Sequence, residues 1–215
     1  MHLCIRMKQT IEIKRNAHYY VQETIHSAKH ILFVIHGYGQ LAEEFIQEFN
    51  ALKEESILVI APEAISKFYN KDRKAVANWM TSHERLDEIN DYVLYLNAVR
   101  EKIIQDYGVL PFSVLGFSQG VSTALRWVCN SALQPSSFYA CSGSIPPELE
   151  RQDFVSLSNS LIFYYYGNRD RLLLPEHARK QIEILKCFEL VIKEREYEGR
   201  HEVSLEAQQD IITSI

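Results

Sequence analysis

A serine lies between glycines near the middle of the chain, at Ser118 in the motif GFSQG. The apolar run before it, 112–117, has the composition of a buried strand, and the segment after it, 119–130, has the spacing of a helix. A serine at such a sharp strand-to-helix turn holds its hydroxyl above a sheet, and glycines leave room for the crowded backbone. The motif in this context predicts Ser118 as the nucleophile of an acyl-transfer reaction.

A serine hydroxyl is a weak nucleophile near neutral pH, so the chemistry requires a general base. Where a nucleophile occupies this kind of turn, the chain order is serine, acid, histidine. Only His177 and His201 follow Ser118. His177 falls inside an expected helix, whereas His201 follows the last expected strand, where a loop can bring its imidazole over the sheet. We therefore predict His201 as the base.

The base needs a carboxylate that fixes its tautomer and stabilises its charged form. Asp170 comes three residues after the strand-like run 161–167, at the carboxyl end of that strand. Two alternatives are Asp153, in the loop after the preceding strand, and Asp210, in the middle of an expected helix. The position of Asp170 favours it as the acid.

Acyl transfer also requires backbone amides that bind the developing oxyanion. The strand-like run 31–35 leads into HGYGQ, in which two glycines around Tyr38 allow its N–H to turn toward the nucleophile. The amide of Gln119, at the start of the helix after Ser118, is the second predicted donor. His36 is expected to brace this loop and to take no part in proton transfer.

Strands and helices alternate along the segments that must position these residues. Strands are expected at 31–35, 57–62, 112–117, 136–143, 161–167 and 190–197, and helices at 41–54, 86–107, 119–130, 176–187 and 202–214. Alternating pieces at 2–7, 9–14 and 18–24 predict antiparallel strands near the N-terminus. This order predicts an α/β fold with a mostly parallel central sheet, helices on both of its faces and a site at the carboxyl ends of the strands.

The composition limits the classes of function. The length of 215 residues, without a linker-like stretch, predicts a single domain over 1–215. The formal charge of −5 includes no basic run, so nucleic acid is not an expected partner. No stretch approaches the roughly 20 apolar residues of a membrane span, no secretory signal is visible, and a cytoplasmic location is expected. The four cysteines form no CxxC pair, and neither a metal nor a cofactor is expected.

Four motifs, HGYG, GFSQG, GNRDRLLLP and GRHEVS, follow one another over nearly the whole chain. In this order they resemble the phospholipase/carboxylesterase family of α/β-hydrolases, which includes small bacterial carboxylesterases and acyl-protein thioesterases. The resemblance implies the α/β-hydrolase fold and the same assignments reached above: Ser118, Asp170 and His201 as triad, and Tyr38 with Gln119 as oxyanion donors. Three places depart from the family pattern, namely Gln40 where Asp is usual, Arg200 directly before the base, and the stretch 77–81. The cation of Arg200 either lowers the pKa of the base or points to solvent.

Substrate preference is the least specified property. The irregular stretches 63–83 and 143–159 follow strand ends and should border the site. An apolar acyl cleft is predicted from Phe68, Tyr69, Trp79, Met80, Leu172 and Leu173, although ordinary packing is an equal alternative for each. Segments between strands are too short for an inserted lid domain. We expect an esterase for short to medium acyl chains, acting on a small molecule as a monomer or homodimer; the alternatives are an acyl thioesterase, a lysophospholipase, a peptidase or a non-catalytic binding protein.

Overall fold

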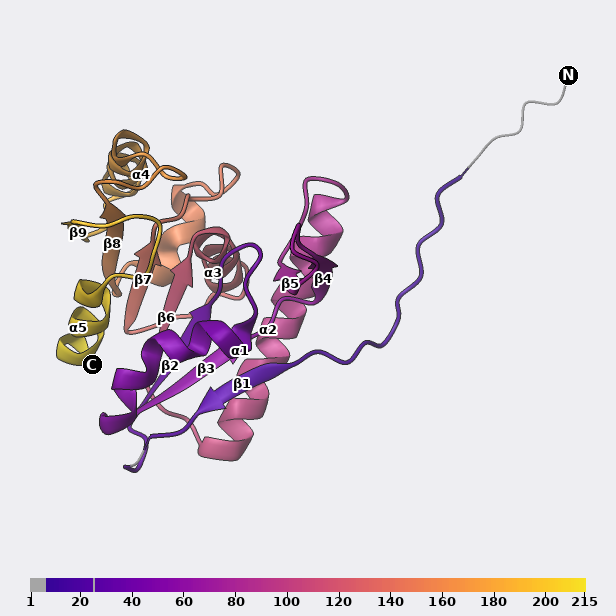
Figure 1. The fold of residues 1–215 in the computed structure, drawn as a ribbon, viewed down its shortest axis with the longest axis horizontal. Helices are drawn as coiled ribbons and strands as arrows, with labels where there is room; N and C mark the ends of the chain where they lie inside the picture. The colour runs from indigo at the N-terminus through magenta and orange to yellow at the C-terminus, as the bar shows by residue number, and fades with distance from the viewer. Residues whose placement is uncertain (1–6, 25) are drawn as a thin grey trace, which may run out of the picture.

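The computed structural model describes residues 7–24 and 26–215. At its centre lies a seven-stranded sheet (Figure 1). From edge to edge the strands are β1 (Tyr19–Gln22), β3 (Ile57–Pro62), β2 (His30–Ile35), β6 (Phe112–Phe117), β7 (Ser137–Cys141), β8 (Leu161–Gly167) and β9 (Ile192–Tyr197). β1 runs antiparallel to β3, and the other neighbours are parallel. The predicted mostly parallel sheet with an antiparallel N-terminal strand is confirmed.

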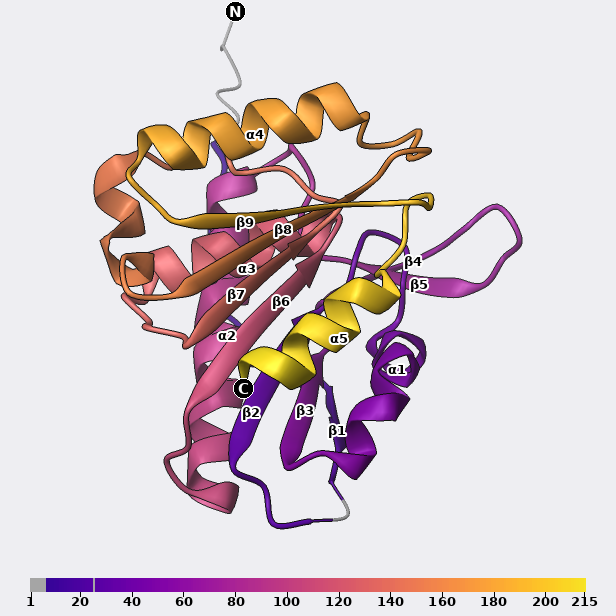
Figure 2. The ribbon, with the colours of Figure 1, turned by 90° about the vertical axis from the view of Figure 1, so that its left-hand side faces the viewer.

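Helices cover both faces of the sheet (Figure 2). One face carries α2 (Arg85–Tyr107), α3 (Gln119–Asn130) and α4 (Pro175–Cys187), and the other carries α1 (Ala42–Phe45), the 3-10 helix η1 (Ile46–Glu54) and α5 (Leu205–Ser214). Side chains alternate along a strand, so Phe33 of β2 packs into the first layer and Val34 into the second. Burial on both sides explains why the central strands are continuous apolar runs.

Two segments differ from their prediction. The expected helix 41–54 is a short α-helix followed by η1, and within η1 Phe49 has non-helical backbone angles (φ −102°, ψ 15°) that mark a kink. The expected strand 9–14 is wrong: these residues form an exposed arm that leaves the body of the molecule (Figure 1), with Ile11 84% exposed. Alternation alone does not make a strand where no neighbouring strand accepts its hydrogen bonds. Residues 2–6 of the other expected strand lie outside the described residues.

The irregular stretch 63–83 contains a hairpin that the sequence did not reveal. Its strands, β4 (Ser66–Tyr69) and β5 (Ala75–Asn78), pair antiparallel and form a separate two-stranded sheet. A short 3-10 helix, η2 (Arg151–Leu157), lies within the second irregular stretch. Between residues 26 and 215 the strand connections contain these pieces and the covering helices, with no inserted lid domain. Within the described ranges, no helix is long and apolar enough to cross a membrane.

Candidate active site

Ser118 occupies a strained turn between β6 and α3. Its backbone angles, φ 53° and ψ −119°, lie outside the regions that L-residues ordinarily adopt. A Cβ on Gly116 would lie 2.5 Å from the carbonyl oxygen of Gly120, and a Cβ on Gly120 would lie 2.0 Å from the carbonyl oxygen of Ile35. Both glycines of the motif are therefore required by close backbone contacts, and the turn holds Ser118 at the carboxyl edge of the sheet.

An imidazole and a carboxylate meet at the same edge. His201 Nδ1 lies 2.7 Å from Asp170 Oδ2, and the carboxylate is fully buried. Asp170 Oδ1 also accepts the backbone N–H groups of Leu172 (2.8 Å) and Leu173 (3.0 Å). With Asp170 ionised, Nδ1 carries the proton, which leaves Nε2 of His201 free to accept one. The ring of His201 also packs against Phe117, with centroids 5.0 Å apart.

Tyr197 fixes the loop that carries the base. Its hydroxyl lies 2.9 Å from the carbonyl oxygen of Arg200 and 2.8 Å from that of Glu202, on either side of His201. Ser142 Oγ is 3.1 Å from the same hydroxyl, and burial raises the pKa of Tyr197 to about 12, so the group stays protonated. The Arg200 side chain points to solvent. Sequence reasoning missed Tyr197, whose only signal is its place at the end of the last strand.

The competing acids and bases are engaged elsewhere. His177 is exposed on α4. Asp153 accepts the backbone N–H of Glu150 in the cap of η2, and Asp210 forms an ion pair with Arg195 at 2.9 Å. Of the three carboxylates considered from the sequence, Asp170 is the one that contacts His201.

The loop after β2 lies beside the nucleophile. A Cβ on Gly37 would come within 3.1 Å of the Ser118 Cβ, so the two backbones are in close contact. Tyr38 follows, and Gly39 has φ +76°, a conformation that glycine adopts without strain. Gln119 is the first residue of α3, where a backbone N–H has no acceptor within the helix. The amides of Tyr38 and Gln119 thus belong to the two segments that flank Ser118.

Gln40 braces this loop in place of the expected Asp. Its Oε1 accepts the Gly37 N–H at 2.7 Å. The loop backbone pairs with the hairpin, since the Gly39 N–H donates to the Ala77 carbonyl (2.9 Å) and the Ala77 N–H donates to the Gln40 carbonyl (3.1 Å). An amide therefore supplies the acceptor that a carboxylate would supply.

His36 is a buried structural residue, as the sequence predicted. Its Nδ1 donates to the Gly37 carbonyl at 2.7 Å, and its Nε2 accepts the Ala64 N–H at 3.1 Å. Complete burial lowers the pKa of His36 to about 4, so the ring is neutral near pH 7. The Trp79 indole N–H donates to the His36 carbonyl at 2.9 Å, which ties the hairpin to the same loop.

The Gln119 side chain joins the nucleophile helix to the hairpin. Its Nε2 donates to Asn78 Oδ1 (2.8 Å) and to the Met80 carbonyl (3.1 Å), while its Oε1 accepts the Trp79 N–H (3.3 Å). All of its polar atoms are engaged, so the side chain stays beside the site. The stretch 77–81, which differs from the family pattern, therefore supports the nucleophile turn through these hydrogen bonds.

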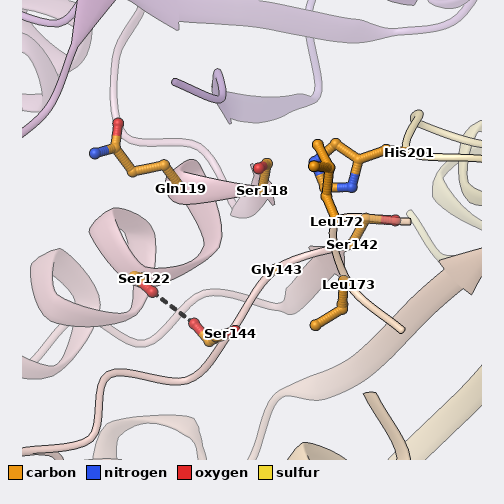
Figure 3. A pocket seen from close by; sticks show the side chains of 9 residues that line it. All are labelled: Ser118, Gln119, Ser122, Ser142, Gly143, Ser144, Leu172, Leu173 and His201. Atoms are coloured by element: carbon orange, nitrogen blue, oxygen red, sulfur yellow. Dashed lines mark hydrogen bonds between the residues drawn. The ribbon is translucent and has the colours of Figure 1, made fainter. Parts of the chain in front are cut away.

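An open pocket of about 220 Å³ lies over these residues (Figure 3). Nine residues line it: Ser118, Gln119, Ser122, Ser142, Gly143, Ser144, Leu172, Leu173 and His201. The structure thus brings together five residues predicted for the site. Ser142 to Ser144 were missed individually, although 143–159 was expected to border the site, and Ser122 was missed because its signal is only its position one turn after the nucleophile.

The other four residues predicted for the acyl cleft do not line this pocket. Trp79 is 1% exposed and belongs to the core, and Met80 is half-buried under α3. Phe68 packs against the Tyr38 ring at a tilt, with centroids 5.1 Å apart, and Tyr69 points to solvent. The hairpin and the residues directly after it thus place these side chains outside the pocket, which apolar character in the sequence did not indicate.

Comparisons with known proteins bear on the family and the fold of the chain. The sequence pattern of the phospholipase/carboxylesterase family matches residues 16–215. Solved structures with a similar fold include acyl-protein thioesterase 2 of Zea mays (18% identity, TM-score 0.71, covering 92% of this chain and 97% of that one). Another is esterase PE8 (17% identity, TM-score 0.73, covering 93% of this chain and 97% of that one). A third is a phospholipase/carboxylesterase from Dyadobacter fermentans (18% identity, TM-score 0.68, covering 94% of this chain and 97% of that one). No curated protein matches significantly. The predicted α/β-hydrolase fold is confirmed.

Proposed function

The chain belongs to the phospholipase/carboxylesterase family, and on that basis we propose that it is a serine carboxylesterase whose triad is Ser118, His201 and Asp170. The observation that carries the proposal is the 2.7 Å contact between His201 Nδ1 and the buried Asp170, beside a pocket that Ser118 and His201 both line. A buried carboxylate that orients an imidazole next to a strained serine has the roles that acyl transfer requires.

The proposed reaction has two halves. Ser118 Oγ attacks the acyl carbon while His201 Nε2 takes its proton, and negative charge on the former carbonyl oxygen meets the Tyr38 and Gln119 amides. The carbon–oxygen bond to the alcohol then breaks, and His201 returns the proton to the departing oxygen. Water attacks the acyl-enzyme in the second half, His201 takes the water proton, and the proton returns to Ser118 as the acid leaves. Every step uses groups of the chain and water.

Asp170 acts on the base through hydrogen bonds. Its carboxylate accepts the backbone N–H groups of Leu172 and Leu173 and contacts His201 Nδ1. Its role is to hold the Nδ1–H tautomer and to stabilise the imidazolium. The size of the pocket supports esters of short to medium acyl chains as substrates.

Replacement of the nucleophile tests the proposal. We expect Ser118→Ala to lower kcat for 4-nitrophenyl butyrate by about 10⁶-fold and to abolish labelling by a fluorophosphonate probe. Ser113→Ala is the matched control, because Ser113 lies in β6, the strand that precedes Ser118, and is fully buried and away from the pocket. It should keep turnover and labelling. Undiminished turnover in Ser118→Ala would refute the assignment.

A further inference from the structure

Four of the nine residues that line the pocket beside Ser118, the nucleophile included, carry a hydroxyl. Ser122 comes from α3, and Ser142 and Ser144 come from the segment after β7 (Figure 3). Of the nine lining residues, Leu172 and Leu173 are the aliphatic ones. A wall of this composition favours groups that form hydrogen bonds, because an alkyl group gains little there and removes water from the hydroxyls.

The serines retain hydrogen-bonding capacity toward a ligand. Ser122 Oγ donates to the Ser144 carbonyl at 2.6 Å, which leaves the lone pairs of Ser122 free to accept. The Ser144 side chain is exposed at the rim, where its hydroxyl rotates and both donates and accepts. Ser142 Oγ is already paired with the Tyr197 hydroxyl, so it contributes mainly to the shape of the pocket.

The floor of the pocket is closed to an alkyl chain. A Cβ on Gly143 would lie 2.3 Å from the Ser118 carbonyl oxygen and 2.4 Å from Val121 Cγ2, so the backbone after β7 packs directly beneath the nucleophile turn. Below it, apolar side chains that include Val121, Phe138, Ile145 and Tyr164 leave a space of about 10 Å³. That is roughly the smallest space able to hold one water, so the apolar space that the described residues leave beneath the nucleophile turn is too small for an alkyl chain.

We propose that the substituent of the ester bound in this pocket is short and carries a hydroxyl, or another small hydrogen-bonding group, near the scissile carbonyl. The inference rests on the proposed function, because Ser118 and His201 mark the pocket as the substrate's. A volume of about 220 Å³ is small for a ligand pocket, so a short substituent fits it best. The polar group belongs to either the acyl or the alcohol half of the ester, since the pocket touches both the nucleophile and the residue that protonates the leaving group.

Matched substrate pairs test each half. The acyl arm compares 4-nitrophenyl 3-hydroxybutyrate with 4-nitrophenyl butyrate, and the alcohol arm compares glycerol monoacetate with propyl acetate. Each kcat/KM is divided by the hydroxide-catalysed rate of the same ester, which removes intrinsic reactivity. We expect the hydroxylated member of one pair to be favoured about tenfold, the value of one well-placed hydrogen bond to an uncharged group.

Variants locate the preference in the pocket. Ser122→Ala should reduce the hydroxylated-to-plain ratio of the preferred pair to near one. Ser158→Ala, an exposed serine outside the pocket, should keep the ratio. Ratios near one in both arms for the unaltered protein, or a rise of kcat/KM with each added methylene up to dodecanoate, would overturn the inference. If turnover still requires Ser118 in that case, the proposed hydrolase stands, whereas turnover that is independent of Ser118 would remove both.

Discussion

One serine lies near the start of strand β6 and another directly follows its end, and each shares its surroundings with a histidine. At the amino end, Ser113 Oγ lies 3.0 Å from His30 Nε2, and both residues are buried. At the carboxyl end, Ser118 follows the strand and shares the pocket with His201. The two pairs contain the same functional groups, but only the second has the surroundings of a catalytic site.

The surroundings account for the difference. Ser113 lies in regular strand, whereas Ser118 has the positive φ of a tight turn that opens onto a pocket. The hydrogen bond of His30 is to a hydroxyl, and burial lowers its pKa to about 4. His201 is held by Asp170 instead. The hydrogen bond between Ser113 and His30 shows that a serine beside a histidine is insufficient. The turn, the carboxylate, the opening and the nearby amides supply what the chemistry requires.

The largest expected effect that would sharpen this comparison comes from Asp170→Asn. An amide at this position presents N–H toward Nδ1 and favours the tautomer whose Nε2 is already protonated, so His201 would resemble a histidine without an acid. We expect kcat for 4-nitrophenyl butyrate to fall about 10⁴-fold. The control is Asp153→Asn, whose carboxylate contacts Glu150 away from the pocket, and it should leave kcat unchanged. A loss below tenfold for Asp170→Asn would contradict the triad.

The parts of the site that the sequence predicted are those whose role follows from position along the chain. GFSQG lies between a buried strand and a helix, and Asp170 and His201 follow β8 and β9, so the parallel sheet necessarily brings them to one edge. Continuous apolar runs specified the central strands for the same reason, since both faces are covered. These inferences depend on order and burial alone.

The parts of the site that the sequence did not predict depend on the direction in which a side chain points once tertiary contacts form. Trp79 and Phe68 are as apolar as any residue of an acyl cleft, yet the hairpin places one in the core and the other against Tyr38. In the sequence Ser122 is an ordinary helix residue, and only the fold brings the segment that carries Ser144 next to it. The strand expected at 9–14 has the right alternation and lacks a neighbour. Such outcomes depend on tertiary contacts that no local pattern contains.

A second prediction compares the histidines through stability at acidic pH. The pKa values of His30 and His36 are lowered by burial from 6.5 to about 4. Between these values the unfolded forms of the two histidines bind more protons than the native forms, so their contribution to the free energy of unfolding should fall as the pH drops from about 6.5 to 4, by up to about 3 kcal/mol for each group. Urea titrations across this range measure the loss.

Variants assign that loss to particular residues. His30→Asn keeps a hydrogen-bonding group beside Ser113 but removes the titrating ring, so its stability should depend less steeply on pH than that of the parent protein. His177→Asn, an exposed site on α4, should have the parental slope. Equal slopes in all three proteins would mean that His30 is protonated in the native state, which would contradict its description as a neutral structural residue.

The smallest expected effect is a difference in thermal stability between glycine variants of Ser118 and Ser113. Ser118 has φ 53° and ψ −119°, a strained conformation that costs about 1–3 kcal/mol and that glycine adopts freely. Glycine also gains about 0.5–1 kcal/mol of freedom in the unfolded chain, so Ser118→Gly should stabilise the protein by about 1 kcal/mol and raise Tm by about 2–4 °C. Ser113→Gly relieves no strain, leaves His30 without its partner and should lower Tm by a similar amount. Thermal unfolding of both variants beside Ser118→Ala, which keeps the strain, measures the contrast. A parallel fall in Tm for Ser118→Gly and Ser113→Gly would show that the nucleophile turn stores no strain, and the two ends of β6 would then differ in their partners and opening alone.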